Sequence, residues 1–424
     1  MRRGFALLSL CIAGVCAATV QAATPAACGK LLPPAQGVYF GASPGYGGED
    51  AYFPGIADGF DQEAGLKASW TMLGQWWSST LPFPAKAIQS IWQDGKVPYL
   101  RLNPYPQQVL DVDFNGMPPG PFTLEDITAG KYDAQLRAWA DTARDLDIPI
   151  LVEFGTEENN YFPWSVRNNG PDGAAVFREA FRHIVTLTRN EGATNITWFF
   201  HGDTLYYYAQ PSWNALSLMY PGDDYVDWLG LSLYAFPKFD NSGYTSLAEK
   251  LDTYHEPGAV GAYTDLTSVS SRPLALVEVG FNRVPRPARV PWVADAAATI
   301  KAGMFPRLKS LVWWNIGGPG DFESSISATP EFKAAFRAAF DDPFFAAKPQ
   351  FTGDCAPSSA PKKVTWKAGT LTWTSVPNAQ QYEIWRGAKK LGTTTYTRFD
   401  AAKHTKYRVR AVNLAGVSAF TTSR

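Results

Sequence analysis

The chain has 424 residues, with 38 basic and 39 acidic side chains and a formal net charge of −1. This length suits one large domain with an appendage. A balanced charge argues against a nucleic-acid or anionic-lipid partner, because both require a basic surface. Aromatic residues make up 14% of the chain and include 15 Trp, so we expect a core rich in aromatic side chains.

The N-terminus has the pattern of a secretory signal peptide. Arg2 and Arg3 precede the apolar run Ala6–Thr19, and a short segment with small residues follows it. Such a run is too short to span a membrane, and the two arginines are more typical of an ordinary positive n-region than of a twin-arginine signal. We therefore predict a signal peptide over residues 1–22, a mature protein that is secreted or periplasmic, and no membrane span.

Eight strand candidates follow along the chain, and several are near-continuous apolar runs, as expected for strands covered on both faces. Between them, Tyr132–Leu146 and Ala174–Arg189 carry apolar residues at helical spacing. This alternation favours a (β/α)8 TIM barrel over an open doubly wound sheet, and the glycine fingerprint of a dinucleotide site is missing. The candidates are Gly37–Ser43, Ala68–Trp77, Val97–Asn103, Ile148–Glu157, Asn195–His201, Asp227–Ala235, Pro273–Phe281 and Lys309–Ile316.

Two cysteines remain in the predicted mature chain, Cys28 and Cys355, because Cys11 and Cys16 leave with the signal peptide. Two thiols in an oxidising compartment are expected to pair. Their disulfide would join the segment before the first barrel strand to the segment after the last helix. The four histidines are scattered and form no cluster with Cys at metal-ligand spacing. We predict no metal site and no cofactor.

The composition changes to Pro, Ser, Ala and Lys near residues 346–363, which indicates a linker. The short β segments beyond it resemble a fibronectin type III domain through residues 371–373, 382–387 and 407–416. The resemblance covers about 65 residues against roughly 100 in a full sandwich, so we expect a truncated first strand. The predicted organisation is a signal peptide over 1–22, a barrel over 23–350, a linker over 351–361 and a small all-β sandwich domain over 362–424.

We expect this second domain to be an accessory spacer or docking module without catalytic residues. Trp373, Tyr382 and Tyr407 alternate with polar residues, as the core residues of a sandwich do. Their burial would leave no cluster of exposed aromatic residues for sugar. Because the linker is short and contains Pro and Ser, some relative motion of the two domains is the default expectation.

Two glutamates, Glu157 and Glu278, end two of the apolar strand candidates. Residues at the C-terminal ends of barrel strands carry the chemistry in (β/α)8 enzymes. Two carboxylates that face each other across a barrel mouth are the minimal machinery for cleaving a glycosidic bond. The competing interpretations are a rim salt bridge for Glu157 and, for Glu278, a buried ion pair with Arg101 or Arg283.

Two further glutamates compete with Glu157 for its role. Strand alternation places Glu153 on the same face as Glu157, and Glu158 on the opposite face. Glu153 lies deeper in the strand, so we expect it to be a paired structural acid lower in the barrel.

The barrel segments resemble glycoside hydrolase family 26, the β-mannanase and β-1,3-xylanase group within the clan of retaining (β/α)8 glycosidases. The resemblance implies that Glu157 is the general acid/base, that Glu278 is the nucleophile and that Tyr234 hydrogen-bonds the nucleophile. Only the combination of segments is specific. They are Ile127–Asp133, Phe154–Trp164, Phe177–Ile184, Gly192–Trp198 and Tyr220–Trp228, with Tyr234 after them.

The chain departs from the family around the acid/base. In the family, a His precedes this glutamate, whereas this chain has Thr156 there. The Met and the Gly that follow the glutamate in the family are replaced by Glu158 and Asn160. That His normally contacts sugar and tunes the neighbouring glutamate. A second carboxylate at Glu158 could raise the pKa of Glu157 if the two approach closely. Specificity for mannan is therefore open, and a bacterial exopolysaccharide is the alternative substrate.

Strand-end positions also nominate residues for substrate binding. Arg101 could hold Glu278 ionised, and the position of Trp314 in the eighth strand favours stacking on sugar. His201 is either a sugar ligand or a strand-end His with a satisfied partner, two interpretations that the sequence supports equally. His183, within an amphipathic helix, is expected to be structural. The other candidates for substrate contact are Trp76, Asn159, Tyr161 and Trp164.

The leading hypothesis is a secreted, endo-acting, retaining β-glycosidase, a monomer that hydrolyses a polysaccharide or oligosaccharide. Glu278 would attack the anomeric carbon while Glu157 protonates the leaving oxygen, and water would then release the sugar. The two carboxyl groups should lie about 5–5.5 Å apart. Outside the enzymes, the alternative is a non-catalytic carbohydrate-binding surface protein, which the retention of both glutamates disfavours.

Overall fold

The computed structural model describes residues 26–43, 56–77, 79–106, 122–204, 212–238, 242–252, 260–315, 317, 323–402 and 406–423. The predicted signal peptide lies outside these residues, and so do two of the four histidines, His255 and His404. Among the described residues, no helix has the length and apolar character that crossing a membrane requires.

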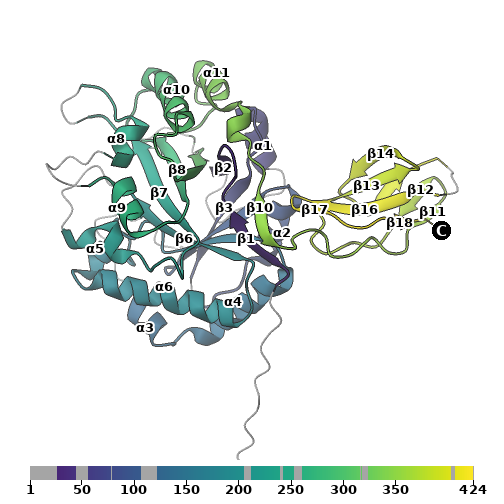
Figure 1. Ribbon diagram of the computed structural model, residues 1–424, viewed down its shortest axis with the longest axis horizontal. Helices are drawn as coiled ribbons and strands as arrows, with labels where there is room; N and C mark the ends of the chain where they lie inside the picture. Colours follow the sequence, from purple (N-terminus) through teal and green to yellow (C-terminus); the bar gives the residue numbers. More distant parts are fainter. Residues whose placement is uncertain are drawn as a thin grey trace, which may run out of the picture.

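Eight parallel strands, paired in chain order and closed on themselves, form a barrel surrounded by helices (Figure 1). This confirms the predicted (β/α)8 fold, and each strand candidate overlaps one strand of the barrel. The largest difference is in the fourth candidate, where the strand ends at Phe154, three residues before Glu157. The strands are β2 (Tyr39–Ser43), β3 (Trp70–Trp76), β4 (Val97–Asn103), β5 (Ile150–Phe154), β6 (Ile196–Asp203), β7 (Trp228–Ala235), β8 (Leu274–Phe281) and β9 (Leu308–Trp314).

The helices pack their apolar faces on the outside of the barrel. The two helices predicted from spacing match α4 and α6 below to within one residue at each end. His183 lies on α6, where its Nε2 is 2.6 Å from Oδ1 of Asp133, in keeping with a structural role. The helices are α1 (Ile56–Ala64), α2 (Ala85–Gln93), α3 (Leu124–Thr128), α4 (Asp133–Leu146), α5 (Val166–Asn169), α6 (Gly173–Asn190), η3 (Ser212–Asn214), α7 (Leu216–Met219), α8 (Leu247–Asp252), α9 (Ala262–Val269), α10 (Arg286–Lys301), α11 (Pro330–Phe340) and η4 (Pro343–Phe345).

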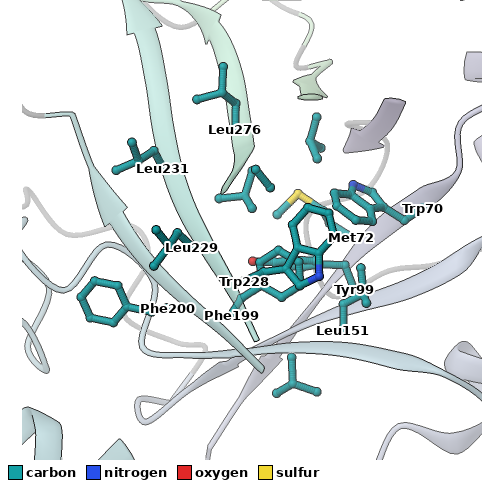
Figure 2. Close-up of a cluster of buried hydrophobic side chains, with 14 of the residues drawn as sticks. Trp70, Met72, Tyr99, Leu151, Phe199, Phe200, Trp228, Leu229, Leu231 and Leu276 are labelled. Carbon is teal, nitrogen blue, oxygen red and sulfur yellow. The ribbon is translucent and has the colours of Figure 1, made fainter. Parts of the chain in front are cut away.

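An aromatic layer fills the lower part of the barrel interior (Figure 2). Trp70 from β3 contacts Tyr99 from β4, Phe199 from β6 and Trp228 from β7, with ring centroids 5.9–6.3 Å apart. Phe199 and Trp228 stack at 5.7 Å. All four side chains are at most 1% exposed. The barrel is therefore a packed core, and the space for polar groups lies above this layer, towards the C-terminal ends of the strands.

A two-stranded antiparallel ribbon, β1 (Cys28–Leu32) paired with β10 (Gln350–Gly353), lies at the N-terminal end of the barrel. Leu31 anchors it there, because its N–H donates to Thr197 Oγ1 at 2.8 Å and its carbonyl accepts from Trp228 Nε1 at 3.1 Å. A disulfide joins Cys28 to Cys355, as predicted. The sequence did not foresee β1, and β10 occupies residues expected to begin the linker.

The C-terminal part consists of two antiparallel sheets, which confirms an all-β domain. Trp373, Tyr382 and Tyr407 are at most 6% exposed and lie in its core, as predicted. Trp385 and Phe420 form an edge-to-face pair outside that core, which the sequence did not foresee. One sheet contains β11 (Thr365–Lys367), β12 (Thr370–Thr372) and β15 (Arg398–Asp400); the other contains β13 (Gln381–Arg386), β14 (Lys389–Thr394), β16 (Arg408–Asn413), β17 (Gly416–Val417) and β18 (Thr421–Thr422).

The small domain is docked on the barrel through specific hydrogen bonds. Gln380 Nε2 donates to the carbonyl of Trp92 at 2.6 Å, and Trp92 Nε1 donates to the carbonyl of Asn378 at 3.2 Å. Asn378 Nδ2 donates to the carbonyl of Asp147 at 3.0 Å. Trp92 precedes β4 and Asp147 precedes β5, so the contact is at the N-terminal end of the barrel (Figure 1). These bonds would restrict the relative motion that is expected of the two domains.

Candidate active site

An irregularity in β8 positions Glu278. The register of β7 and β8 pairs Leu231 with Leu276 but Ser232 with Glu278, so Val277 is an extra residue on β8. The ladder between β8 and β9 is irregular over the same positions. A bulge of this kind bends the strand and re-aims a side chain, and bulges are frequent next to active sites.

Both carboxylate oxygens of Glu278 have donors. Arg101 Nη2 donates to Oε1, and the Tyr234 hydroxyl donates to Oε2 at 2.5 Å. Glu278 is only 4% exposed and Arg101 only 2%, so these bonds form largely out of contact with water. Burial, followed by the charge of Glu278, raises the pKa of Tyr234 well above its usual range, and the phenol therefore stays a donor. The contact with Tyr234 is the one that the resemblance implied.

Glu157 lies in a turn beyond the end of β5. Gly155 and Glu157 have φ values of 71° and 52°. The left-handed region is uncommon for a residue with a side chain and costs of order 1–3 kcal/mol, and such residues cluster at functional sites. Because the strand ends at Phe154, the alternation argument that placed Glu153 and Glu157 on one strand face is wrong.

The surroundings of Glu157 favour its protonated form. Its side chain is 8% exposed, and Asn160 Nδ2 donates to its Oε2 at 2.7 Å. Burial, followed by the negative charges of Asp203 and Glu278, raises the pKa of Glu157 well above its usual range. Hydrogen bonds from Ser232 and Asn160 oppose this rise without reversing it. A neutral carboxyl group at this position can donate a proton.

The two glutamates meet within the barrel mouth. One carboxylate oxygen of Glu157, one of Glu278 and one ring nitrogen of His201 all lie within 4.8 Å of one another. Sequence spacing did not foresee this cluster, which also resembles a metal-ligand set. The guanidinium of Arg101 already contacts Glu278 and would repel a cation. The oxygen separation suits the closely spaced carboxyl pair of a retaining glycosidase better than the 6.5–9.5 Å of an inverting one.

Glu153 is the centre of a buried polar network below this pair. It accepts from the Tyr99 hydroxyl at 2.5 Å and from Thr156 Oγ1 at 2.6 Å. Arg101 Nε lies 3.1 Å and His201 Nδ1 lies 2.7 Å from its carboxylate oxygens. Burial raises the pKa of Glu153, but the charges of His201 and Arg101 and the hydrogen bonds outweigh burial and lower it to about 2. The carboxylate is thus a structural acid, as expected.

His201 connects this network to Glu157. Its side chain is fully buried, and its Nε2 lies 2.9 Å from Ser232 Oγ, which in turn is hydrogen-bonded to Glu157. These contacts favour the second interpretation left open by the sequence, a strand-end His with satisfied partners. Through these contacts the buried imidazole orients Glu153 and Ser232.

Glu158 points away from the pair and towards β6. It is fully buried, and its Oε1 accepts from the backbone N–H of His201 at 3.1 Å. Burial raises the pKa of Glu158 well above its usual range, and the nearby charges of Glu153 and Glu157 add to the rise. A protonated Glu158 adds no charge beside Glu157, so the main electrostatic influences on Glu157 come from Asp203 and Glu278.

Two predicted sugar contacts have structural roles instead. Asn159 Nδ2 donates to the Asp203 carbonyl at 2.9 Å and Asn159 Oδ1 accepts from the Asp203 N–H at 2.8 Å, so the nitrogen and the oxygen of its side-chain amide are both engaged. Trp164 is 3% exposed, and its Nε1 donates to the carbonyl of Thr156 at 2.9 Å. These bonds fix the turn that carries Glu157 and engage the polar atoms of two side chains that were expected to bind substrate.

The remaining residues predicted to contact substrate, Trp314, Trp76 and Tyr161, are aromatic. The Trp314 ring, at the end of β9 and 8% exposed, lies 5.2 Å from the Arg101 guanidinium carbon. Trp76 ends β3 and remains partly exposed beside Trp164. The partly exposed ring of Tyr161 lies 4.1 Å from the guanidinium carbon of Arg167. Trp76 and Tyr161 thus retain exposed surface for a ligand.

Sequence reasoning missed four residues near Glu157. Asp203 ends β6 and Asn160 bridges it to Glu157. The strand-end rule could have found Asp203, whereas nothing in the sequence marks Ser232. Lys250 on α8 is 2% exposed; burial lowers its pKa to about 8, and the charges of Asp203 and Glu157 act against this.

The sequence model of glycosyl hydrolase family 26 matches residues 128–265, a span that contains Glu157 and Tyr234. The chain is 28% identical to Endoglucanase H of Acetivibrio thermocellus over 230 residues, which are 52% of this chain and 23% of that protein. It is 26% identical to a β-1,3-xylanase of an Alcaligenes species over 144 residues, 34% of this chain and 27% of that protein. The chain thus spans about a quarter of the length of these relatives.

Among solved structures, the catalytic domain of a family 26 endo-β-1,4-mannanase of Bacillus sp. JAMB-750 aligns with a TM-score of 0.52. It has 17% identity and covers 73% of this chain and 87% of that one. A double mutant of the Cellulomonas fimi endo-β-1,4-mannanase aligns with a TM-score of 0.50, 16% identity and coverage of 92% and 94%. At these identities the likeness shows the fold alone.

Proposed function

We propose that the barrel belongs to glycosyl hydrolase family 26, whose sequence model matches residues 128–265, and that the protein is a secreted, endo-acting, retaining glycosidase of a β-linked polysaccharide. The observation that carries this proposal is the pairing of Glu157 and Glu278, whose oxygens approach within 4.8 Å. The two carboxyl groups have opposite environments. Glu278 contacts the Arg101 cation, whereas burial and Asp203 favour a neutral Glu157.

The proposed reaction has two steps. In the first, Glu278 attacks the anomeric carbon and forms a glycosyl–enzyme, while Glu157 gives its proton to the leaving oxygen. In the second, the Glu157 carboxylate takes a proton from water, the resulting hydroxide attacks the anomeric carbon, and Glu278 is released. The Arg101 guanidinium and the Tyr234 hydroxyl orient the two oxygens of Glu278 for this exchange.

The β-glycan is either a β-mannan-like or related glycan or a bacterial exopolysaccharide. The relatives are named for different glycans, an endoglucanase and β-1,3-xylanases. The family's sugar-contacting His is replaced by Thr156, which is 4% exposed and donates to Glu153. This replacement removes one expected mannan contact and favours a bacterial exopolysaccharide as the second candidate substrate.

Product analysis tests the proposal. Purified enzyme is incubated with mannan, β-1,3-xylan, β-glucans and bacterial exopolysaccharides, and the products are sized and their anomeric configuration is followed by NMR. We expect a ladder of oligosaccharides from one polymer, with retained configuration, and no products from Glu278→Ala. Inverted products would overturn the retaining mechanism. Binding without turnover by a folded wild type on every polymer would support the non-catalytic alternative.

A further inference from the structure

The near-neutral total charge conceals two oppositely charged parts. Residues 362–424 contain 12 Lys and Arg against 2 Asp and Glu, a formal charge of +10. The whole chain has 38 against 39, so residues 1–361 have 26 against 37, a formal charge of −11. The argument from total charge against a polyanionic partner therefore does not apply to the small domain.

Cations on this domain gather around one aromatic side chain. In the five-stranded sheet, Trp385 on β13 pairs with Arg408 on β16 and with Lys390 on β14. Ile384, the preceding residue, is fully buried, whereas Trp385 is partly exposed. Because side chains alternate between the faces of a sheet, Trp385 and its two basic neighbours lie on the outer face.

A second ring and a second arginine complete this surface. The Phe420 ring meets Trp385 edge to face, with centroids 5.9 Å apart. The Arg410 guanidinium carbon lies 5.5 Å from the Trp385 ring and 4.8 Å from Phe420, and that of Arg408 lies 4.4 Å from Phe420. We call Trp385, Lys390, Arg408, Arg410 and Phe420 the basic aromatic face.

One acid orients these groups. Glu383 accepts from Lys390 Nζ and Arg410 Nε, each at 2.7 Å, and from Trp385 Nε1 at 3.0 Å. The two long basic side chains and the indole are therefore held in place before any ligand arrives, which lowers the entropic cost of binding. Two net positive charges remain on the face, and the exposed Arg386 and Lys389 border it.

We propose that the basic aromatic face binds an acidic polysaccharide whose sugars carry carboxylates. Flat indole and phenyl rings suit the apolar face of a sugar, and guanidinium groups bind carboxylates with two parallel hydrogen bonds. Both kinds of group lie within one surface here. A neutral glycan would need the rings but not a domain charge of +10.

This site goes beyond the proposed hydrolysis. The remaining chain, with its charge of −11, repels a polyanion, so the acidic polymer is an anchor and not the substrate of the barrel. The domain docks through Asn378 and Gln380 at the N-terminal end of the barrel. Neither residue belongs to the basic aromatic face, and the catalytic pair lies at the opposite end. Anchoring and hydrolysis can therefore take place together.

Affinity electrophoresis of the full chain carrying Glu278→Ala tests the proposal without interference from turnover. We expect strong retardation in gels that contain polygalacturonate, little in gels that contain neutral dextran, and weakening as salt is raised, because attraction between charged partners is screened. Binding to dextran of equal strength, or no retardation by polygalacturonate, would overturn it. Since hydrolysis is not measured, failure here leaves the proposed function untouched.

Matched variants locate the site. We expect Arg408→Gln/Arg410→Gln to weaken binding roughly tenfold, because two of the three cations of the face are lost and each exposed ion pair is individually weak. Lys362→Gln/Lys363→Gln removes the same charge from two exposed residues outside the face and should weaken binding less than about twofold. Lys390→Gln, at a side chain that is 42% exposed, tests the face with little risk to folding. Equal losses in both double variants would show diffuse charge attraction and overturn the site.

The same variants also test two other possible ligands of the basic aromatic face, nucleic acid and a second copy of this chain. Binding to duplex DNA that is tighter than to polygalacturonate, and lost in the arginine double variant, would assign the face to nucleic acid. Self-association in sedimentation velocity that requires the two arginines, without retardation by polygalacturonate, would assign it to the acidic barrel of a second copy. Either result would overturn the proposal.

Discussion

The carboxylates of Glu157 and Asp203 share one donor, the Nδ2 amide of Asn160, at distances of 2.7 and 3.1 Å. The bridge holds two acids side by side where β5 and β6 end. Burial, followed by the charges of Asp203 and Glu278, raises the pKa of Glu157. Asp203 is therefore a positioning residue that helps to keep the proposed general acid protonated.

Removing the charge of Asp203 should shift the pH profile. A general acid must be protonated, so activity falls as the pH rises through its pKa, and the basic limb of kcat/KM reports that pKa in the free enzyme. Asp203→Asn lowers the pKa of Glu157, so we expect the basic limb to move to lower pH. Asp145→Asn, at a side chain that is 69% exposed on α4, is the control. An unmoved limb in a folded Asp203→Asn variant would contradict this account.

The two glutamates should respond differently to substitution. Glu278→Ala should reduce kcat by roughly 10⁴-fold or more, because the nucleophile is lost. Glu157→Ala should slow natural substrates by roughly 10²–10⁴-fold. The loss should be smaller for aryl glycosides with good leaving groups, which need no protonation, and azide should partly restore their turnover. If Glu158→Ala is the damaging change and Glu157→Ala is not, the assignment is off by one residue.

Two neighbouring buried glutamates should give opposite pH dependences of stability. The raised pKa of Glu158 means that the folded state keeps a proton that the unfolded chain releases near pH 4.3. Its contribution is therefore fully present below about pH 4 and is lost as the pH rises towards the folded pKa. We expect Glu158→Gln, a neutral isostere, to gain stability relative to the wild type between pH 5 and pH 8, measured by urea unfolding.

Glu153 provides the contrast. Its pKa is lowered to about 2, so its contribution is present above about pH 4.3 and is lost as the pH falls through about 2. Glu153→Gln should destabilise the protein at pH 7 by roughly 3–5 kcal/mol, because it leaves the buried Arg101 charge without one of its partners. Loss of stability at pH 8 in both variants would contradict the assignment of a neutral Glu158.

The disulfide between Cys28 and Cys355 should stabilise the barrel by connecting its two ends. The residues are 327 positions apart, and closing a loop of that length contributes roughly 5 kcal/mol in the chain-entropy model, with smaller values often measured. We expect Cys28→Ser/Cys355→Ser to lower Tm, with activity retained below the transition. Two free thiols in the unfolded, unreduced wild type would show that the bond does not form.

Truncation should separate the two domains functionally. A chain that ends at Ala356 keeps the disulfide and loses the small domain, whose contacts with Trp92 and Asp147 lie away from the catalytic pair. We expect turnover of soluble oligosaccharides within about twofold of the full chain, because distant, independent units behave additively. Action on insoluble or cell-bound polymer should fall more. Loss of soluble-substrate turnover in a folded truncated protein would mean that the small domain contributes to the site.

The sequence by itself was enough to predict the barrel and its eight strands, and it singled out two glutamates, Glu157 and Glu278, that the fold brings together. Buried parallel strands read as apolar runs, and chemistry lies at their C-terminal ends, so local composition carries this information. Cys28 and Cys355 could be paired because only two cysteines remain in the predicted mature chain. The charge of the small domain was also present in the sequence, but the total over the whole chain concealed it.

Tertiary structure alone decided how the site is assembled. The left-handed turn at Glu157 and the bulge before Glu278 are departures from regular strands, and periodicity cannot predict where a strand stops or slips. The bonds of Asn159 to Asp203 and of Glu153 to His201 join residues about 45 positions apart. Such pairs depend on the register between strands, which is set by packing of the whole barrel and not by any one segment.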